Sequence, residues 1–136
     1  MSSSRLVLDT DILSLLMRKN AAVLAEAGKY LSEHSQFTIS IITRYEILRG
    51  LKAKGAIKQA ERFEDFCLRN RVLPVDDSVI IQAANIYADL YQRGELIADA
   101  DILIAASAMA NECGLVTNNE THFRRITRLR VENWLH

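Results

Sequence analysis

Several residue types that mark secreted, fibrous or disordered chains are scarce in this sequence. Its 136 residues include one proline, five glycines and two cysteines, and aromatic residues make up 7%. With so little proline and glycine, and with 49% hydrophobic residues, a disordered chain is excluded and the length suits one domain. The two cysteines, Cys67 and Cys113, stand in a chain with no sign of secretion, so we expect free thiols in a reducing cytoplasm.

Long hydrophobic runs and an excess of one charge are also missing. The longest apolar runs, such as residues 102–106, fall far short of the ~20 residues that cross a bilayer. Residues 1–5 include no apolar segment, so we expect no signal peptide. Lys and Arg number 17 and Asp and Glu also number 17, which gives a net charge of +0. This balance argues against nucleic-acid binding driven by the overall charge of the protein, but it does not exclude binding by a local basic surface.

Short aliphatic runs alternate with segments of helical period along the whole chain. The runs predict strands at 6–8, 37–41, 71–73, 115–117 and 129–131. The periodic segments predict helices at 12–16, 21–33, 42–55, 56–70, 78–92 and 99–113. Asp76 and Asp77 are placed to cap the helix at 78–92, and Gly114 is placed to stop the helix at 99–113. This alternation predicts one α/β domain over residues 1–136, with a largely parallel central sheet flanked by helices.

Two aspartates follow the first predicted strand, where the ligands of parallel α/β proteins bind. Asp11 precedes Ile12, where a helix cap belongs, so we interpret it as a cap. Asp9 closes a strand that is apolar throughout, and this position favours a functional role.

Glu46 lies early in the helix that follows the second predicted strand. Its ordinary partner is Arg49, one turn further on, in an exposed ion pair worth about a few tenths of a kcal/mol. Ile42 and Gly50 lie one turn to either side and favour a partly buried face instead. Glu46 considered alone leaves both interpretations open.

Asp99 and Asp101 open the most apolar helix of the chain. From residue 102 to residue 110 this helix carries one polar side chain, Ser107, so we expect it to be buried on nearly every side. One acid at its start suffices as a cap, because a helix N-terminus favours negative charge. We therefore predict Asp99 as the cap and Asp101 as a ligand for a cation.

Polar, uncharged residues follow the fourth predicted strand. Thr117, Asn118 and Asn119 either line the crevice and position water, or form an Asx-type turn in which Asn119 caps the next helix. His122 has no cysteine or second histidine at the spacing of a zinc site. We interpret it as a surface or packing histidine.

Three of these carboxylates would repel one another if the fold brought them together. At roughly 4 Å each pair among Asp9, Glu46 and Asp101 costs about 1–4 kcal/mol, which a shared proton or a hard cation relieves. Oxygen ligands without thiolates favour Mg²⁺ or Mn²⁺ over zinc. Such a metal orients water, eases its deprotonation and neutralises charge on a phosphate under attack. This chemistry is phosphodiester hydrolysis, and it suits a sequence that has neither a nucleophile elbow nor a glycine-rich phosphate loop.

These segments, in this order, resemble the PIN-domain family, and within it the VapC toxins of bacterial toxin–antitoxin pairs. The resemblance covers nearly the whole chain, down to residues 129–134. Each segment alone is a weak indicator of the family, whereas the four in this order are a specific one. They are residues 8–11 (LDTD), 40–46 (SIITRYE), 101–106 (DILIAA) and 115–119 (LVTNN) followed by Phe123.

The resemblance implies an endoribonuclease that uses Mg²⁺ or Mn²⁺ and cuts structured RNA such as tRNA or ribosomal RNA. It also implies a homodimer and inhibition by a small antitoxin wrapped around the toxin. By position it implies that Asp9, Glu46 and Asp101 are the metal-binding acids, with Asp99 an additional acid found in some members. The family often has a further Asp where this sequence has Asn119, and this departure favours a one-metal site until RNA supplies phosphate oxygens.

Two other classes of protein compete with a nuclease. A phosphoryl-accepting receiver domain also places acids at strand ends, and Asp9, Asp76 and Thr117 imitate its phosphoacceptor, metal and switch positions. It also needs a lysine after the last strand, and residues 129–136 contain none. A non-catalytic binding module on the same PIN fold is the other alternative, and Mn²⁺ binding would distinguish it from the nuclease.

Basic residues near the predicted site are candidates for RNA contact. Arg44 and Arg49 lie nearest to Glu46 in sequence, so we prefer them as RNA phosphate contacts. Two further basic groups are explained equally well as solvated helix faces. They are Lys52, Lys54, Lys58 and Arg62, and Arg124, Arg125, Arg128 and Arg130. With few aromatic residues, recognition of RNA shape and backbone is favoured over base reading.

Overall fold

Five short strands form the centre of the computed structural model, which describes residues 4–136. They are β1 (Leu6–Leu8), β2 (Thr38–Ser40), β3 (Arg71–Leu73), β4 (Gly114–Val116) and β5 (Val131–Glu132). Their order across the sheet is β3-β2-β1-β4-β5, and every neighbouring pair runs parallel. The predicted α/β fold with a parallel sheet is confirmed. The expectation of no signal peptide falls mostly on residues 1–3, outside the described part of the chain.

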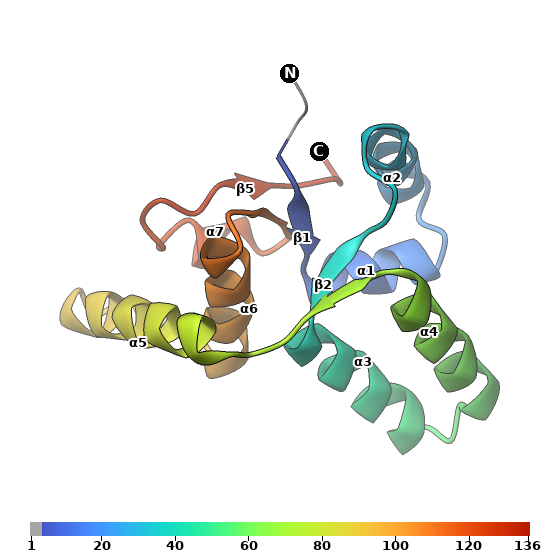
Figure 1. The fold of residues 1–136 in the computed structure, drawn as a ribbon, viewed down its shortest axis with the longest axis horizontal. Helices are drawn as coiled ribbons and strands as arrows, with labels where there is room; N and C mark the ends of the chain where they lie inside the picture. Colours follow the sequence, from blue (N-terminus) through green and yellow to red (C-terminus); the bar gives the residue numbers. More distant parts are fainter. Residues whose placement is uncertain (1–3) are drawn as a thin grey trace.

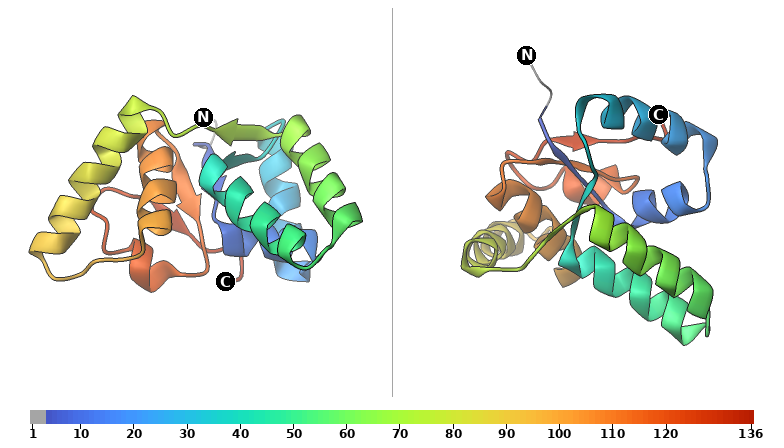
Figure 2. Two further views of the ribbon diagram at one scale, coloured as in Figure 1. Left: turned by 90° about the horizontal axis from the view of Figure 1, so that it is seen from below. Right: turned by 45° about the vertical axis from the view of Figure 1, so that its right-hand side comes forward.

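Helices cover both faces of this sheet (Figure 1). One face packs against α1 to α4 and the other against α5 to α7, so the domain has three layers (Figure 2). The helices are α1 (Thr10–Met17), α2 (Ala21–Glu33), α3 (Ile41–Ala53), α4 (Ile57–Arg69), α5 (Asp77–Gln92), α6 (Asp99–Ala110) and α7 (Glu120–Phe123). Within residues 4–136, no helix combines the length and the apolar content that a bilayer crossing requires.

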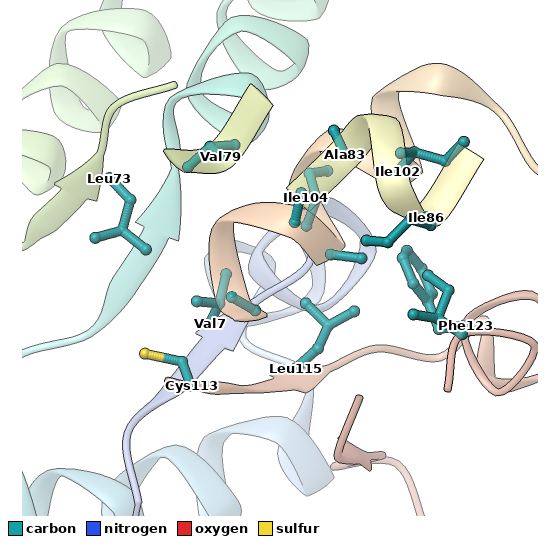
Figure 3. Close-up of a cluster of buried hydrophobic side chains, with 14 of the residues drawn as sticks. Val7, Leu73, Val79, Ala83, Ile86, Ile102, Ile104, Cys113, Leu115 and Phe123 are labelled. Atoms are coloured by element: carbon teal, nitrogen blue, oxygen red, sulfur yellow. The ribbon is translucent and has the colours of Figure 1, made fainter. Parts of the chain in front are cut away.

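The central strands are buried on both faces, which is why they are apolar throughout. Val7 of β1 and Leu115 of β4 face the cluster formed with α5 and α6 (Figure 3). Leu8 and Val116, one residue later on the same strands, pack in the opposite cluster against α1 to α4. Because successive side chains of a strand point to opposite faces, β1 and β4 each contribute to both cores.

The element boundaries differ from the predictions at a few positions. Gly114 begins β4 and does not stop α6, which ends at Ala110. A Cβ at Gly114 would lie 2.7 Å from Arg130 Nε and 2.9 Å from Leu6 Cδ2, so close packing across the strands explains this glycine. Asp76 caps α5 as predicted, since its carboxylate accepts a hydrogen bond from the Val79 N–H at 3.1 Å.

The order in which the chain adds strands to the sheet changes side at β1. The chain fills the β2 and β3 positions on one side, then returns to place β4 and β5 on the other. Open parallel sheets bind ligands at such a switch point, outside the carboxyl ends of the strands. Here Asp9 follows β1 and Thr117 follows β4, so both lie at the switch point.

Candidate active site

Asp9 is the most deeply buried carboxylate at this end of the sheet, with 5% of the residue exposed. One oxygen accepts the N–H of Thr10 at 2.8 Å, which caps α1, and the other accepts the Thr117 hydroxyl at 2.7 Å. Asp9, and not Asp11 as predicted, is therefore the cap of α1. Burial, followed by the negative charge of Asp11, raises the pKa of Asp9 from 3.8 to about 7.

Asp11 lies on the first turn of α1 and turns toward the loop after β4. Its Oδ2 accepts the N–H of Asn118 at 3.1 Å. Its Oδ1 is buried and has no hydrogen-bond partner in the described part of the chain. Burial raises the pKa of the Asp11 carboxyl above its ordinary value. Burying an oxygen without a hydrogen-bond partner costs free energy, so a proton or a cation at Asp11 Oδ1 would stabilise the site.

Glu46 reaches the same region from α3. Its Oε1 accepts the Thr10 hydroxyl at 2.6 Å, and that hydroxyl also lies 3.0 Å from the Thr43 hydroxyl. Arg49 pairs with Glu46 at 3.8 Å, as predicted, and its guanidinium also lies over the Tyr45 ring. The Glu46 side chain is 20% exposed, so both interpretations that the sequence left open, the ion pair and the partly buried face, hold in the structure. Thr10 therefore joins α1 to the acid of α3.

Asp101 is the fourth carboxylate of this cluster, because the charges of Glu46 and Asp11 both act on it. Burial, and then the charge of Glu46, raises the pKa of Asp101; the nearby imidazole of His122 lowers it, and the charge of Asp11 raises it. Asp99 is exposed at the start of α6. The cap position there is Ala98 and no side chain caps the helix, so the prediction of Asp99 as the cap is wrong.

The loop after β4 holds this cluster from the other side. The Thr117 hydroxyl donates to Asp9 and accepts the N–H of Asn119 at 3.0 Å. Asn118 is exposed, and its amide oxygen accepts from Asn133 at 3.1 Å. Asn119 precedes α7 as predicted but makes no side-chain cap hydrogen bond.

His122 contributes to the site, which the sequence did not predict. The Asn119 amide nitrogen lies 2.8 Å from His122 Nδ1, and the half-buried imidazole acts on the pKa of Asp101. The interpretation as a surface or packing histidine was therefore incomplete. Its spacing of one helical turn from Asn119 was the available signal.

The two arginines preferred as phosphate contacts occupy different surroundings. Arg49 lies beside Glu46. Arg44 lies on another side of α3, where its guanidinium forms a bidentate ion pair with Glu64 of α4 at 2.9 and 2.6 Å. This pair leaves Arg44 less available to RNA than Arg49.

The chemistry of the cluster fits a hard cation. Among residues 4–136, no three acidic, histidine or cysteine side chains already form a ligand set for a metal ion. The cluster nevertheless presents carboxylate oxygens, which suit Mg²⁺ and Mn²⁺, and one of them, Asp11 Oδ1, is buried without a partner. Binding of an ion would therefore require these side chains to close on it.

Comparison with known proteins decides the family. Residues 6–129 match the PIN domain. The chain belongs to the PIN-domain family. A curated relative of this PIN domain, Ribonuclease VapC1 of Methanocaldococcus jannaschii, is 32% identical over 90% of this chain and 82% of its own length. A second relative, the tRNA(fMet)-specific endonuclease VapC of Shigella flexneri, is 28% identical over 96% of this chain and 98% of its own.

A solved structure shows the same fold. The DNA-bound VapBC complex of Salmonella typhimurium contains a chain that superimposes on this PIN domain with a TM-score of 0.85. The two chains are 28% identical, and the match covers 97% of this chain and 99% of the other. The predicted PIN fold is thus confirmed.

The raised pKa of Asp9 predicts that, in the metal-free PIN domain, the contribution of Asp9 to stability becomes less favourable as the pH rises. The folded-state pKa is about 7 and the ordinary value is 3.8, so the native state binds the extra proton between these values. Asp9→Asn removes this dependence. We expect its free energy of unfolding to exceed that of the wild type by a margin that grows from pH 4 to pH 7, to at most about 4 kcal/mol. Urea unfolding in EDTA at several pH values measures the margin, and a margin independent of pH would contradict the prediction.

Proposed function

We propose that this PIN domain is a metal-dependent endoribonuclease toxin that hydrolyses phosphodiester bonds in structured RNA, such as tRNA or ribosomal RNA. The observation that carries the proposal is the group of Asp9, Asp11, Glu46 and Asp101 at the switch point of the sheet, where Asp9 is buried and the other three are half-buried. Within residues 4–136 one of its oxygens, Asp11 Oδ1, is buried and has no hydrogen-bond partner. The similarity to proteins named Ribonuclease VapC, and to an endonuclease named for tRNA(fMet), supports RNA as the substrate.

Each side chain of the proposed site has a distinct task. Asp9, Glu46 and Asp101 would hold Mg²⁺ or Mn²⁺, and Asp11 would add a fourth carboxylate in place of Asp99. When bound, the ion supplies charge neutralisation at the phosphate and lowers the pKa of water. Thr117 fixes the orientation of Asp9, and Thr10 fixes that of Glu46. Asn118 and Asn119 would also provide polar groups that position water beside the phosphate, whereas the Thr117 hydroxyl is buried and already bonded to Asp9 and Asn119.

We also propose the partners that the resemblance implied. The solved relatives are toxin–antitoxin complexes, which supports a small VapB-like antitoxin as the inhibitor of this chain. A homodimer remains part of the proposal. Both cysteines are free thiols, which is compatible with action in the reducing cytoplasm.

A non-catalytic PIN module remains the second candidate, and metal binding tests it. An intact nuclease site is expected to bind Mn²⁺, whereas a degenerate one is not. The receiver-like alternative receives no support, because the chain belongs to the PIN family and has no lysine after its last strand.

Asp11→Asn and Asp99→Asn distinguish the carboxylate found in the structure from the one suggested by sequence. Both remove one negative charge near the start of a helix, but only Asp11 lies in the cluster. We expect Asp11→Asn to weaken Mn²⁺ binding about tenfold and Asp99→Asn to change it less than about twofold. Isothermal titration calorimetry measures both affinities. A larger loss for Asp99→Asn would return the ligand role to Asp99.

The proposed activity is tested by inducing the wild type and Asp9→Asn in parallel and sequencing the 5′ ends of cellular RNA. New 5′ ends that accumulate only with the wild type would support the proposal and identify the target. Identical profiles from the two proteins, both shown to be folded and expressed, would refute it.

A further inference from the structure

A groove of about 650 Å³ opens between α1, α3 and α4. Thr10 and Glu46 line it, so it is continuous with the carboxylate cluster. From there it extends along the two antiparallel helices α3 and α4, which lie side by side in Figure 2. The groove thus leads away from the proposed site across the face of the domain.

Four cationic side chains line this groove, and one acid does. The acid is Glu46, at the site. The cations are Arg18, Lys54, Arg62 and Arg69. All four are exposed, and none belongs to an ion pair within residues 4–136, where the paired arginines are Arg44, Arg49, Arg93, Arg124 and Arg130. Unpaired cations along one groove in a chain of zero net charge favour an anionic occupant.

Apolar and aromatic residues also line the groove. Phe63 is buried and stacks on the half-buried Phe66 with ring centroids 6.2 Å apart. Leu51 adds an aliphatic surface from α3. Cations together with the half-buried Phe66 and Leu51 match the chemistry of an RNA strand, which presents phosphates to the cations and ribose or base faces to the apolar groups.

We propose that this groove binds the RNA strand on one side of the scissile phosphate. The proposal rests on the proposed ribonuclease function and specifies how its substrate is held. The carboxylate cluster repels the phosphates of an RNA strand. The adjacent cations offset this repulsion for the phosphates next to the scissile one, which lie in the groove. An acidic segment of a protein partner is the competing occupant.

The test compares two double substitutions on the same two helices. Lys54→Gln with Arg62→Gln removes two groove cations, one at the C-terminal cap of α3 and one on α4. Lys52→Gln with Lys58→Gln removes two exposed cations from the same helices that do not line the groove. Both are surface changes, so the two melting temperatures serve as a check that folding is equal.

Binding is measured by fluorescence anisotropy with a labelled RNA stem–loop, in an Asp9→Asn background that keeps the RNA intact. Each phosphate contact contributes about 0.7 to 0.9 to the slope of log affinity against log salt. We expect the groove variant to lose a slope of about 1.5 and to bind about tenfold more weakly near 0.15 M salt. The control is expected to retain the starting affinity and slope.

Equal RNA affinity of the groove variant and the control would overturn the proposal. So would a groove variant that keeps its RNA affinity but loses binding of poly-L-glutamate, because this result would assign the groove to an acidic protein segment. The ribonuclease activity is tested separately, by cleavage with proteins that carry Asp9. A chain that binds RNA through the groove but cuts none would contradict the proposed function and not the groove.

Discussion

Asp9→Asn is expected to reduce RNA cleavage on the order of 10³-fold while the protein stays folded. Asp9 is the buried centre of the cluster, and it accepts hydrogen bonds from both α1 and the loop after β4. An amide keeps the shape of the side chain but removes the charge that a divalent cation requires. Cleavage of a labelled stem–loop RNA in Mn²⁺ gives the rate.

Asp99→Asn is the matched control, because it removes the same charge at an exposed position on α6. We expect its cleavage rate to stay near that of the wild type. Circular dichroism and urea unfolding establish that both variants are folded. An Asp9→Asn protein that cleaves at the wild-type rate would refute the assignment of the active site.

Phe123→Ala is expected to destabilise the protein by about 3–5 kcal/mol. Phe123 is fully buried and lies in the same core cluster as Ile86 and Ile102 (Figure 3). It also ends α7, the short helix that carries His122. Loss of the ring therefore leaves a cavity and releases the anchor of the loop that contacts Asp9 and Asp11. Urea unfolding at pH 7 measures the stability.

Tyr91→Ala provides the comparison for Phe123→Ala, because Tyr91 is 64% exposed on α5. We expect it to cost less than about 1 kcal/mol. Phe123→Leu, which keeps most of the buried volume, is expected to fall between the two. Equal losses for Phe123→Ala and Tyr91→Ala would contradict the anchoring role of Phe123.

Three of the four clustered carboxylates were predicted from the sequence, for a physical reason. Asp9 follows a strand that is apolar throughout, Asp101 opens an apolar helix, and Glu46 lies on a partly buried face. Asp9 and Asp101 were recognisable because a charge beside buried residues needs compensation. The surroundings of Glu46 left two interpretations open, and its role as a metal-binding acid came from the family resemblance. The location of the site could be predicted because the carboxyl ends of parallel strands lie at one edge of the sheet, where ligands bind.

The cap roles predicted for Asp11 and Asp99 were both wrong, because Asp9 caps α1 and no side chain caps α6. Both precede apolar helical residues, and a helix start accepts an acid as a cap or as a neighbour of the dipole. Sequence spacing does not distinguish these cases. The structure distinguishes these cases, because Asp11 is half-buried and bonded to the loop after β4, whereas Asp99 is exposed.

The basic residues show the same limit. From the sequence, Arg44 and Arg49 are equally plausible as phosphate contacts near Glu46. In the structure they lie on different sides of α3, so Arg44 pairs with Glu64 and Arg49 lies beside the site. Lys54 and Arg62 belong to one predicted basic group with Lys52 and Lys58. Packing of α3 against α4 places only the first two in the groove.

The sequence by itself determined the order of strands and helices, the parallel sheet, the PIN family and the strand ends at which the acids lie. The order of elements, the parallel sheet and the strand ends follow from local periodicity and chain direction, which are properties of neighbouring residues. The PIN family rests instead on the resemblance of four segments in order. Only the tertiary structure decided which charges share a buried volume. Burial and mutual repulsion depend on distances between α1, α3, α6 and the loop after β4, and packing alone sets those distances. For this reason a chain of zero net charge can hold an acidic site and a basic groove side by side.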